Sequence, residues 1–231
     1  MIGIIGAMDI EVNLLREDMT ERREIRIGMD TYTEGLLYGR HVCLTQCGPG
    51  KVNAALCTQN MITAFHPAAI LNIGVAGAGS GDVHVGDVVI GTAAVQHDMD
   101  TSPIGDPVGF VSKINLIQIP CDGELVRNLT EAVKKTDSTP CHTGIIATGD
   151  QFINDEERRN AIHQRFECMA VEMEGAAVAH ACYVNQIPCA VLRTISDESN
   201  GESTLSYAAF AQTAAVHAQK VIRNFMEANE E

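Results

Sequence analysis

Four acidic residues lie next to segments of this sequence that otherwise consist of apolar residues. Glu172 and Glu174 interrupt a run of small apolar residues at 170–177. Asp197 follows an apolar segment that is typical of a buried strand, and Glu11 lies just after the first apolar run of the chain. A buried charge is costly unless it has partners. We therefore expect these carboxyl groups to lie around one pocket.

Several carboxyl groups around one pocket suit acid–base chemistry, or the cleavage of a glycosidic bond through an oxocarbenium-like state. The same pocket would contain Arg193, Phe152, Met8 and Met173. The G-x-S-x-G setting of an activated serine is missing from the sequence, and its eight His and eight Cys do not show the spacing of metal ligands. We predict a site without a metal or a cofactor.

The candidate residues fall at or just after the ends of predicted strands, which is where open α/β sheets bind ligands. The segment 2–5 predicts a first strand and 10–16 predicts a helix, so Glu11 lies at the carboxyl end of a strand. The clusters at strand ends are Glu11, the glycines of 74–81, Phe152 with Ile153, and Ser196 with Asp197. This common placement favours one shared pocket over four separate features.

Three of these clusters also have a purely structural explanation. Glu11 could stabilise the N-terminus of the helix that it begins. The glycines of 74–81 allow a ligand to approach the backbone closely, but a flexible loop would contain them too. Phe152 and Ile153 could tether their loop to the core. The residues alone leave these alternatives open.

Strands and helices alternate along the chain, which predicts a single α/β domain over 1–231 with a central, mixed, twisted β-sheet flanked by helices. The segment 22–47 is typical of a strand meander. The irregular segment 98–113 is long enough for a lid or an interface arm. Asn154 is expected to cap a helix over 155–164. Further strands are predicted at 68–73, 116–119, 142–148, 168–171 and 189–195.

The composition argues against some classes of partner. The 231 residues carry a net charge of −14, and the 16 Lys and Arg residues are scattered rather than clustered. A nucleic acid or an anionic membrane would need a basic surface, so we expect neither as a partner. No apolar run reaches the ~18 residues of a membrane span, and the first residues are typical of a strand rather than a signal peptide. The eight Cys lack a C-x-x-C pair, which favours reduced thiols and a cytoplasmic location.

A set of motifs occurs in one order along almost the whole chain. They are Gly3 to Met8 with Glu11, Gly48 to Lys51, Asn72-x-Gly74-x-Ala76-Gly77, Gly86-Asp87, Gly149-Asp150-x-Phe152-Ile153, Val171 to Glu174, and Arg193-x-Ile195-Ser196-Asp197. Together they resemble the bacterial 5′-methylthioadenosine/S-adenosylhomocysteine nucleosidases of the purine nucleoside phosphorylase/nucleosidase family. The resemblance implies a nucleoside phosphorylase-like fold, hydrolysis of an N-glycosidic bond to adenine and a thioribose, and a homodimer.

The resemblance also implies roles for the acids. Asp197, held by Ser196, would donate a proton or a strong hydrogen bond to adenine N7 and so make the base a better leaving group. Glu11, assisted by Arg193, would position and activate the attacking water. Glu174 would bind the ribose hydroxyls and favour the cationic sugar.

The remaining implied residues would shape the rest of the pocket. They are Glu172 in support, Phe152 stacked on adenine, the Ile153 backbone at the N1/N6 edge of adenine, Met8 and Met173 against the sugar, the backbone of Ala76 and Gly77 near the ribose and base, and Tyr207 with the partner subunit's Ile104 at the 5′ end.

Two other functions are kept as alternatives. A phosphate-dependent purine nucleoside phosphorylase would need a cationic phosphate site, but Arg16, Arg40 and Arg127 are isolated and Glu11 would repel phosphate. A non-catalytic nucleoside-binding protein would not need the acids. Among possible substrates, the sequence does not rank methylthioadenosine, adenosylhomocysteine, 5′-deoxyadenosine and aminodeoxyfutalosine.

Overall fold

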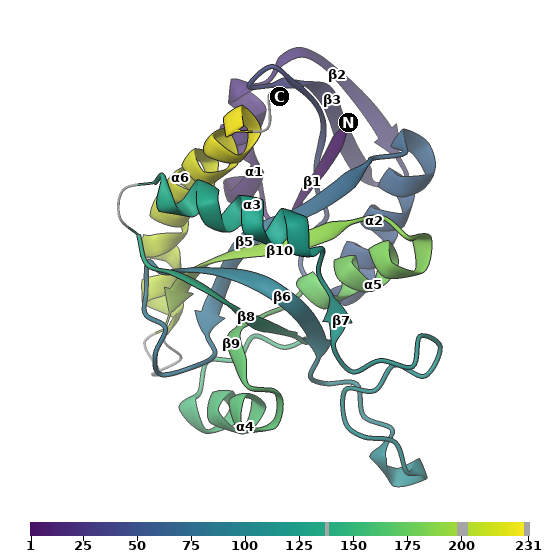
Figure 1. The fold of residues 1–231 in the computed structure, drawn as a ribbon, viewed down its shortest axis with the longest axis vertical. Coiled ribbons are helices and arrows are strands. Elements are labelled where there is room, and N and C mark those ends of the chain that lie inside the picture. Colours follow the sequence, from purple (N-terminus) through teal and green to yellow (C-terminus); the bar gives the residue numbers. More distant parts are fainter. Residues whose placement is uncertain (137–138, 198–202, 229–231) are drawn as a thin grey trace.

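The computed structural model describes residues 1–136, 139–197 and 210–228, and the backbone alone of 203–209. A mixed β-sheet runs through the molecule and helices cover both of its faces (Figure 1). The strands are β1 (Ile2–Gly6), β2 (Thr20–Ile27), β3 (Asp30–Leu37), β4 (Arg40–Gln46), β5 (Ala69–Ala78), β6 (Val88–Gln96), β7 (Ile119–Pro120), β8 (Cys141–Thr148), β9 (Cys168–Glu172) and β10 (Cys189–Asp197). The helices are α1 (Asp9–Asp18), α2 (Lys51–Phe65), α3 (Gly123–Lys134), α4 (Glu156–Phe166), α5 (Gly175–Asn185) and α6 (Ser203–Ala228), with a short 3₁₀ turn, η1 (Ser102–Ile104). The predicted α/β fold with a central mixed sheet is confirmed.

Part of the sheet closes into a ring of five strands. β5 pairs with β10, β10 with β6, β6 with β8, β8 with β9, and β9 returns to β5. From β5 the sheet continues outward through β1, β4, β3 and β2. The alternation of elements did not predict this closure, because it depends on a short antiparallel contact between Gly77–Ala78 of β5 and Ala170–Val171 of β9. The closure brings the ends of β5, β9 and β10 together.

Five of the six helices in the described part of the chain form two layers, and each layer has its own core. On one face α1, α3 and α6 pack with apolar side chains such as Leu15, Leu129 and Ile222 against the sheet. On the other face α2 and α5 contribute Met61 and Val178 to a second core (Figure 1). Because both faces are covered, the central strands consist largely of apolar residues, as parallel strands usually do. β10 is buried at every position.

The strand predicted at 68–73 extends further than expected, because β5 continues to Ala78, so most of 74–81 is strand rather than flexible loop. The close approach is nevertheless real. A Cβ atom on Gly74 would lie 2.7 Å from Glu11 Oε1, and one on Gly79 would lie 2.7 Å from the carbonyl oxygen of Cys168. The groups that approach these glycines are therefore a carboxylate and a neighbouring strand of the protein itself.

Two further local predictions were wrong. Asp155, rather than Asn154, caps α4, because Asp155 Oδ1 accepts the N–H of Arg158 at 2.9 Å. The strand predicted at 116–119 is reduced to β7 at Ile119–Pro120. The irregular segment 98–113 contains only the short turn η1, and it extends away from the sheet below α5 (Figure 1).

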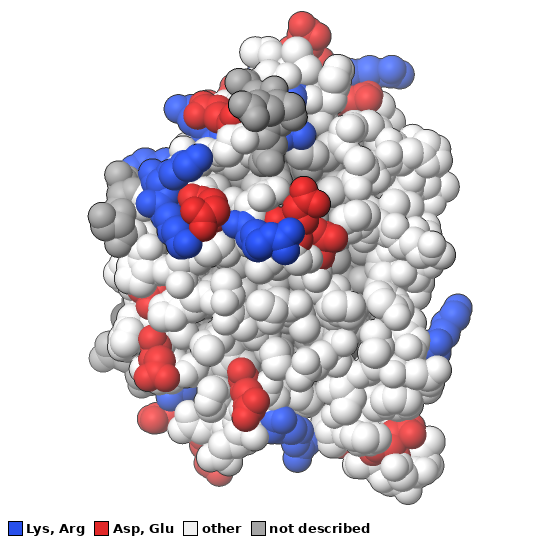
Figure 2. Space-filling model, in the orientation of Figure 1, with Lys and Arg blue, Asp and Glu red and all other residues white. Residues whose placement is uncertain are grey.

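The surface does not concentrate positive charge on the face seen in Figure 2. Lys and Arg side chains there lie among Asp and Glu, mainly over the upper left and the lower rim, and the flank that carries α2 and α5 is largely uncharged. This mixture agrees with the net charge of −14 and offers no basic surface for a polyanion on that face. Among the described residues, no helix is long and apolar enough to cross a membrane.

Candidate active site

A cavity of about 250 Å³ opens where β1, β5, β9 and β10 end. Its size lies near the lower end of small-ligand pockets, about 300–1,000 Å³. Most of the predicted site residues line it. These are Met8, Glu11, Ala76, Gly77, Phe152, Glu172, Met173, Glu174, Ser196 and Asp197. The prediction of one shared pocket at strand ends therefore agrees with the structure.

Glu11 is held at the end of β1 by backbone N–H groups. Its Oε2 accepts the N–H of Ala7 at 2.7 Å and of Met8 at 2.9 Å, and its Oε1 accepts the N–H of Val75 at 3.0 Å. The carboxylate thus caps the N-terminus of α1 and also lines the cavity. The structural interpretation of Glu11, as a helix cap, is therefore compatible with a role in the pocket. Burial raises the pKa of Glu11, against the opposing effects of Arg193 and the N–H donors.

Asp197 reaches the cavity because β10 is irregular at its end. The register between β10 and β5 shifts between Ile195 and Asp197, so the strand carries a bulge at Ser196. Consecutive residues of a regular strand point to opposite faces, whereas a bulge can turn both to one side. Ser196 and Asp197 both line the cavity, and Ser196 Oγ donates to Asp197 Oδ2 at 3.1 Å. Asp197 is only 2% exposed.

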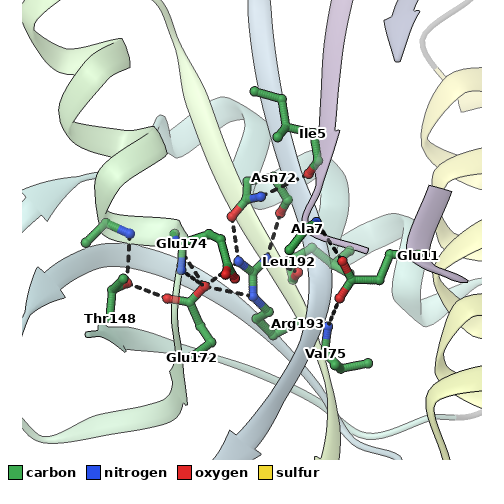
Figure 3. A network of polar contacts seen from close by, with 12 residues as sticks. Ile5, Ala7, Glu11, Asn72, Val75, Thr148, Glu172, Glu174, Leu192 and Arg193 are labelled. Atoms are coloured by element: carbon green, nitrogen blue, oxygen red, sulfur yellow. Dashed lines mark hydrogen bonds and ion pairs between the residues drawn. The ribbon is translucent and has the colours of Figure 1, made fainter. Parts of the chain in front are cut away.

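Glu172 is the centre of a buried polar network beside the cavity (Figure 3). Its carboxylate pairs with the guanidinium of Arg193 and accepts the hydroxyl of Thr148. Its Oε2 also accepts the N–H of Gly175 at 2.7 Å, at the start of α5. Arg193 is bound on its other side by Asn72, whose Oδ1 lies 2.5 Å from Nη2. This geometry supports the predicted supporting role of Glu172.

We predict that Glu172→Gln destabilises the fold. Arg193 is 1% exposed, and the substitution would leave a buried guanidinium without the carboxylate that contacts it directly. Breaking a buried ion pair in this way costs about 3 kcal/mol or more. Urea denaturation should show this loss in the free energy of unfolding. The exposed pair Lys134–Glu131 is the control, because Glu131→Gln should cost less than about 1 kcal/mol. Equal losses in the two variants would contradict the prediction.

Arg193 does not line the cavity, although the sequence assigned it a part in handling water. Its donors go to Glu172, to Asn72 and to the carbonyl of Leu192. Its charge still acts on Glu11, where it opposes the effect of burial on the pKa. Arg193 therefore influences the acids electrostatically from below the cavity surface.

Glu174 lies at the start of α5 and faces the turn that precedes α2. Its Oε1 accepts the N–H of Gly50 at 2.8 Å, and the residue is 7% exposed. Burial, followed by repulsion from Glu172, raises the pKa of Glu174 from 4.5 to about 7. Near neutral pH this carboxyl group can therefore hold or release a proton.

The raised pKa of Glu174 predicts a pH-dependent stability. The folded protein binds a proton at Glu174 up to about pH 7, whereas the unfolded chain loses it near 4.5. The resulting stabilisation is present below 4.5 and is lost as the pH rises to about 7, by on the order of 3 kcal/mol. Denaturation of the wild type and of Glu174→Gln at about pH 5 and about pH 8 measures it. The prediction fails if both proteins lose the same stability between these pH values.

The last four predicted residues lie in four different situations. Phe152 is 48% exposed and lines the cavity, whereas Ile153 is 6% exposed and packs into a core with Phe166 and Val171. Ile104 lies in η1, 82% exposed, and does not line the cavity of its own chain. The backbone of Tyr207 belongs to α6, but its side chain is outside the described residues.

Sequence reasoning did not select several residues that build the site. Those that line the cavity are Ala7, Pro49, Val75 and Val171. Two others act behind it: Asn72 holds Arg193, and Thr148 joins Glu172 to the N–H of Ala176 at 2.8 Å. Asn72 belongs to one of the sequence motifs, and Thr148 ends a predicted strand. Their positions could therefore have pointed to the site, but the sequence assigned neither residue a role there.

The arrangement as a whole suits stabilisation of a cation. Glu11, Glu174 and Asp197 come from three different elements and line one cavity, and they face apolar and aromatic side chains there. Fixed carboxylates in a site that excludes water stabilise developing positive charge strongly. Carboxyl groups with raised pKa values can also exchange protons near neutral pH. Among the described residues, no group of His, Cys, Asp and Glu is arranged to hold a metal ion.

Comparisons of the chain with known proteins identify its family. A family model described as the phosphorylase superfamily matches residues 1–227. A 5′-methylthioadenosine/S-adenosylhomocysteine nucleosidase of Staphylococcus aureus (strain JH9) is 38% identical over 223 residues, which cover 96% of this chain and 97% of that protein.

Solved structures agree with this match. A 5′-methylthioadenosine/S-adenosylhomocysteine nucleosidase from Neisseria meningitidis, in complex with methylthio-immucillin-A, has a TM-score of 0.94 at 33% identity and covers 98% of both chains. The nucleosidase of the same name from Colwellia psychrerythraea 34H, in complex with adenine, has a TM-score of 0.93 at 34% identity and covers 98% of this chain and 94% of that chain. The chain therefore belongs to the phosphorylase superfamily and, within it, to the family of 5′-methylthioadenosine/S-adenosylhomocysteine nucleosidases.

Proposed function

We propose that this protein, as a single nucleosidase domain over 1–231, hydrolyses the N-glycosidic bond of 5′-methylthioadenosine and S-adenosylhomocysteine. The products are adenine and the corresponding thioribose. The observation that carries the proposal is the convergence of Glu11, Glu174 and Asp197 on one cavity with Phe152 at its edge. This set provides a base, a cation stabiliser, an acid and a stacking surface for a purine. Relatives named 5′-methylthioadenosine/S-adenosylhomocysteine nucleosidase, including one in complex with adenine, support the same reaction.

Departure of adenine is the first part of the proposed reaction. The bond between C1′ and N9 breaks, and its electron pair goes to the purine. Asp197 donates a proton or a strong hydrogen bond to N7, so the base leaves without a full negative charge. Ser196, within 3.1 Å of Asp197, keeps this carboxyl group oriented. General-acid assistance of this kind contributes about 10²–10⁴-fold to a rate.

Capture of the sugar is the second part. The ribose carries positive charge at C1′, which the nearby carboxylates stabilise. Glu174 binds the ribose hydroxyls, and Glu11 accepts a proton from the water that attacks C1′. The N–H groups of Ala7, Met8 and Val75 fix Glu11 before the substrate arrives. Such preorganisation avoids the cost of moving dipoles during the reaction.

Hydrolysis is favoured over phosphorolysis by the contacts of Glu11. Backbone N–H groups at a helix N-terminus are a common site for a phosphate. Here the N–H groups of Ala7 and Met8, at the start of α1, already donate to the Glu11 carboxylate. A phosphate ion would have to displace a fixed anion and then lie beside it. Water, which is neutral, meets no such repulsion.

Product analysis tests the proposed function. Purified protein is incubated with methylthioadenosine, adenosylhomocysteine, 5′-deoxyadenosine and aminodeoxyfutalosine, each with and without phosphate, and the products are separated by chromatography. We expect adenine and a free thioribose from the first two substrates at equal rates with and without phosphate. A strict need for phosphate, with a sugar 1-phosphate as product, would establish the phosphorylase alternative. Binding of nucleoside without turnover would establish a binding protein.

We also propose that the protein is a homodimer, in which the partner subunit's Ile104 and Tyr207 of the same chain close the 5′ end of the pocket. Exposed apolar side chains on one flank support this assembly. Val52 and Leu56 of α2 and Val184 of α5 are 68%, 60% and 47% exposed. Asn185 Nδ2 donates to Gln59 Oε1 at 2.8 Å, so α2 and α5 form one continuous face (Figure 1).

Sedimentation measures this assembly directly. We expect the wild type to sediment as a dimer and Leu56→Glu to sediment as a monomer with a weaker affinity for substrates that carry a 5′ substituent. Lys134→Glu, on an exposed part of α3, should leave the dimer intact. A monomeric wild type would overturn the proposal.

The same proposal places the protein in the cytoplasm, within nucleoside breakdown that serves methionine salvage. Its cysteines are free thiols in the structure, and most of them are buried, which suits a reducing compartment.

A further inference from the structure

The turn that precedes α2 lies between two carboxylates that come from different parts of the chain. The N–H of Gly50 donates to Glu174 Oε1 at 2.8 Å, and the next N–H, that of Lys51, donates to Asp150 Oδ1 at 2.7 Å. Gly50 has a φ of 99°, a conformation that other residues rarely adopt. The direction of the Gly50 N–H, and with it the position of the Glu174 carboxylate, therefore depends on what holds this turn.

A closed set of polar contacts holds the turn from outside the cavity. Lys51 Nζ forms an ion pair with Asp98 Oδ1 at 2.6 Å, and Asp98 Oδ2 accepts the N–H of Asp150 at 2.8 Å. Asp150 in turn accepts the N–H of Lys51. We call Lys51, Asp98 and Asp150 the turn clamp. None of the three lines the cavity.

The ion pair between Lys51 and Asp98 stabilises the turn clamp. Burial works against ionisation of Asp98, but the Lys51 ammonium and the N–H of Asp150 outweigh this and lower the pKa of Asp98. The Asp98 side chain is 21% exposed and that of Lys51 is 17% exposed, so water screens the ion pair only in part. Gln96 Oε1 lies 3.3 Å from Lys51 Nζ and completes its hydrogen bonding.

The turn clamp also connects two segments of the chain that line the cavity. Asp150 precedes Phe152 by two residues in the same loop, and Phe152 lines the cavity. Pro49, next to Gly50, lines it as well. Movement of Asp150 would therefore shift the Gly50 N–H at one side and the loop of Phe152 at the other.

We infer that Lys51, Asp98 and Asp150 are positioning residues, which hold the 48–51 turn so that the Gly50 N–H orients Glu174 toward the ribose hydroxyls. This inference rests on the proposed function of the cavity. It assigns to the three residues no contact with substrate. Their effect is transmitted through one backbone N–H, and a misplacement of about 1 Å at such a group can cost about 100-fold in rate.

The experiment compares Asp150→Ala and Lys51→Met with the wild type, and uses Lys134→Met as the control. Lys134 pairs with Glu131 at 2.7 Å on an exposed part of α3, so its substitution removes an ion pair of the same type and charge. kcat and KM are measured with methylthioadenosine and with an analogue that has hydrogen in place of the ribose hydroxyls. The inhibition constant of adenine is measured for every variant, because in the proposed reaction Glu174 binds the ribose and not the base.

For Asp150→Ala and Lys51→Met we expect kcat/KM for methylthioadenosine to fall about 10- to 100-fold. The loss should nearly disappear with the analogue that lacks the hydroxyls, and the inhibition constant of adenine should stay within about twofold. Lys51→Arg should restore most of the activity. In a Glu174→Ala background, Asp150→Ala should add less than about twofold, because the group that it orients is gone.

Equal losses for methylthioadenosine and for its analogue, or a parallel loss of adenine binding and thermal stability, would show a general structural role and overturn the inference. Normal kinetics in Asp150→Ala and Lys51→Met would overturn it as well. If the wild type does not cleave the nucleoside, the proposed function fails separately. Calorimetric binding of the nucleoside and of its analogue then decides the inference, since only the affinity for the nucleoside should fall in the two variants.

Discussion

Asp197→Asn is expected to reduce kcat with methylthioadenosine by about 10²–10⁴-fold, while the protein still binds the nucleoside. An asparagine side chain has nearly the same shape and can keep the contact with Ser196, which lies 3.1 Å from Asp197 Oδ2. It has no acidic proton to give to N7 of the leaving adenine. The variant should therefore lose transition-state stabilisation and retain most ground-state binding.

Stopped-flow or steady-state kinetics, together with calorimetric binding, separate these two effects. Asp122→Asn is the matched control. Asp122 caps α3 away from the cavity, and asparagine is an equally good cap, so its kcat should equal that of the wild type. A kcat of Asp197→Asn close to the wild-type value would remove Asp197 from the role of general acid.

Replacement of Glu11 should reduce kcat by about as much as Asp197→Asn does, but for a different reason. Glu11→Gln removes the base that accepts a proton from water, for which we expect a loss of about 10²–10⁴-fold in kcat. The amide also fits the site poorly, because Ala7, Met8 and Val75 all donate N–H groups to the carboxylate oxygens. The NH₂ group of glutamine would face at least one of these donors and leave it unsatisfied, which costs about 1–3 kcal/mol of stability.

A second variant separates the lost base from the lost stability. Glu11→Ala leaves the same N–H groups open to a small carboxylate, so added formate should restore part of the hydrolysis. Asp9→Asn, in the same turn of α1 but exposed, should show neither a loss nor a response to formate. Wild-type turnover in Glu11→Gln at saturating substrate would exclude Glu11 as the base.

The positions of the strands that carry the site were predicted largely correctly from the sequence, because these strands are long apolar segments. β10 is the clearest example, since it is apolar until Arg193 and ends at Asp197. The first strand and the helix with Glu11 were predicted for the same reason. The placement of acids at strand ends then predicted one pocket, since ligands bind where the strands of an α/β sheet end.

Other features depended on contacts between distant residues, which a single sequence does not encode in its spacing. The glycines at 74 and 79 predicted a close approach, but no pattern in the sequence identified the groups that lie against them, which are the Glu11 carboxylate and the β9 backbone. The position of Arg193 behind Glu172 follows from Asn72, which no pattern linked to it. The bulge at Ser196, which turns Asp197 into the cavity, arises from the register between β10 and β5.

The place of β10 in the sheet affects how the protein is synthesised. Among the described residues it is the last strand of the sheet in chain order, yet it lies between β5 and β6 and pairs with both. A nascent chain that ends before Cys189 therefore exposes two unpaired strand edges, which are prone to aggregation. The same nine residues carry Arg193 and Asp197. Truncated copies should accordingly be insoluble rather than partly active, because the strand that completes the sheet is also the strand that carries the acid Asp197.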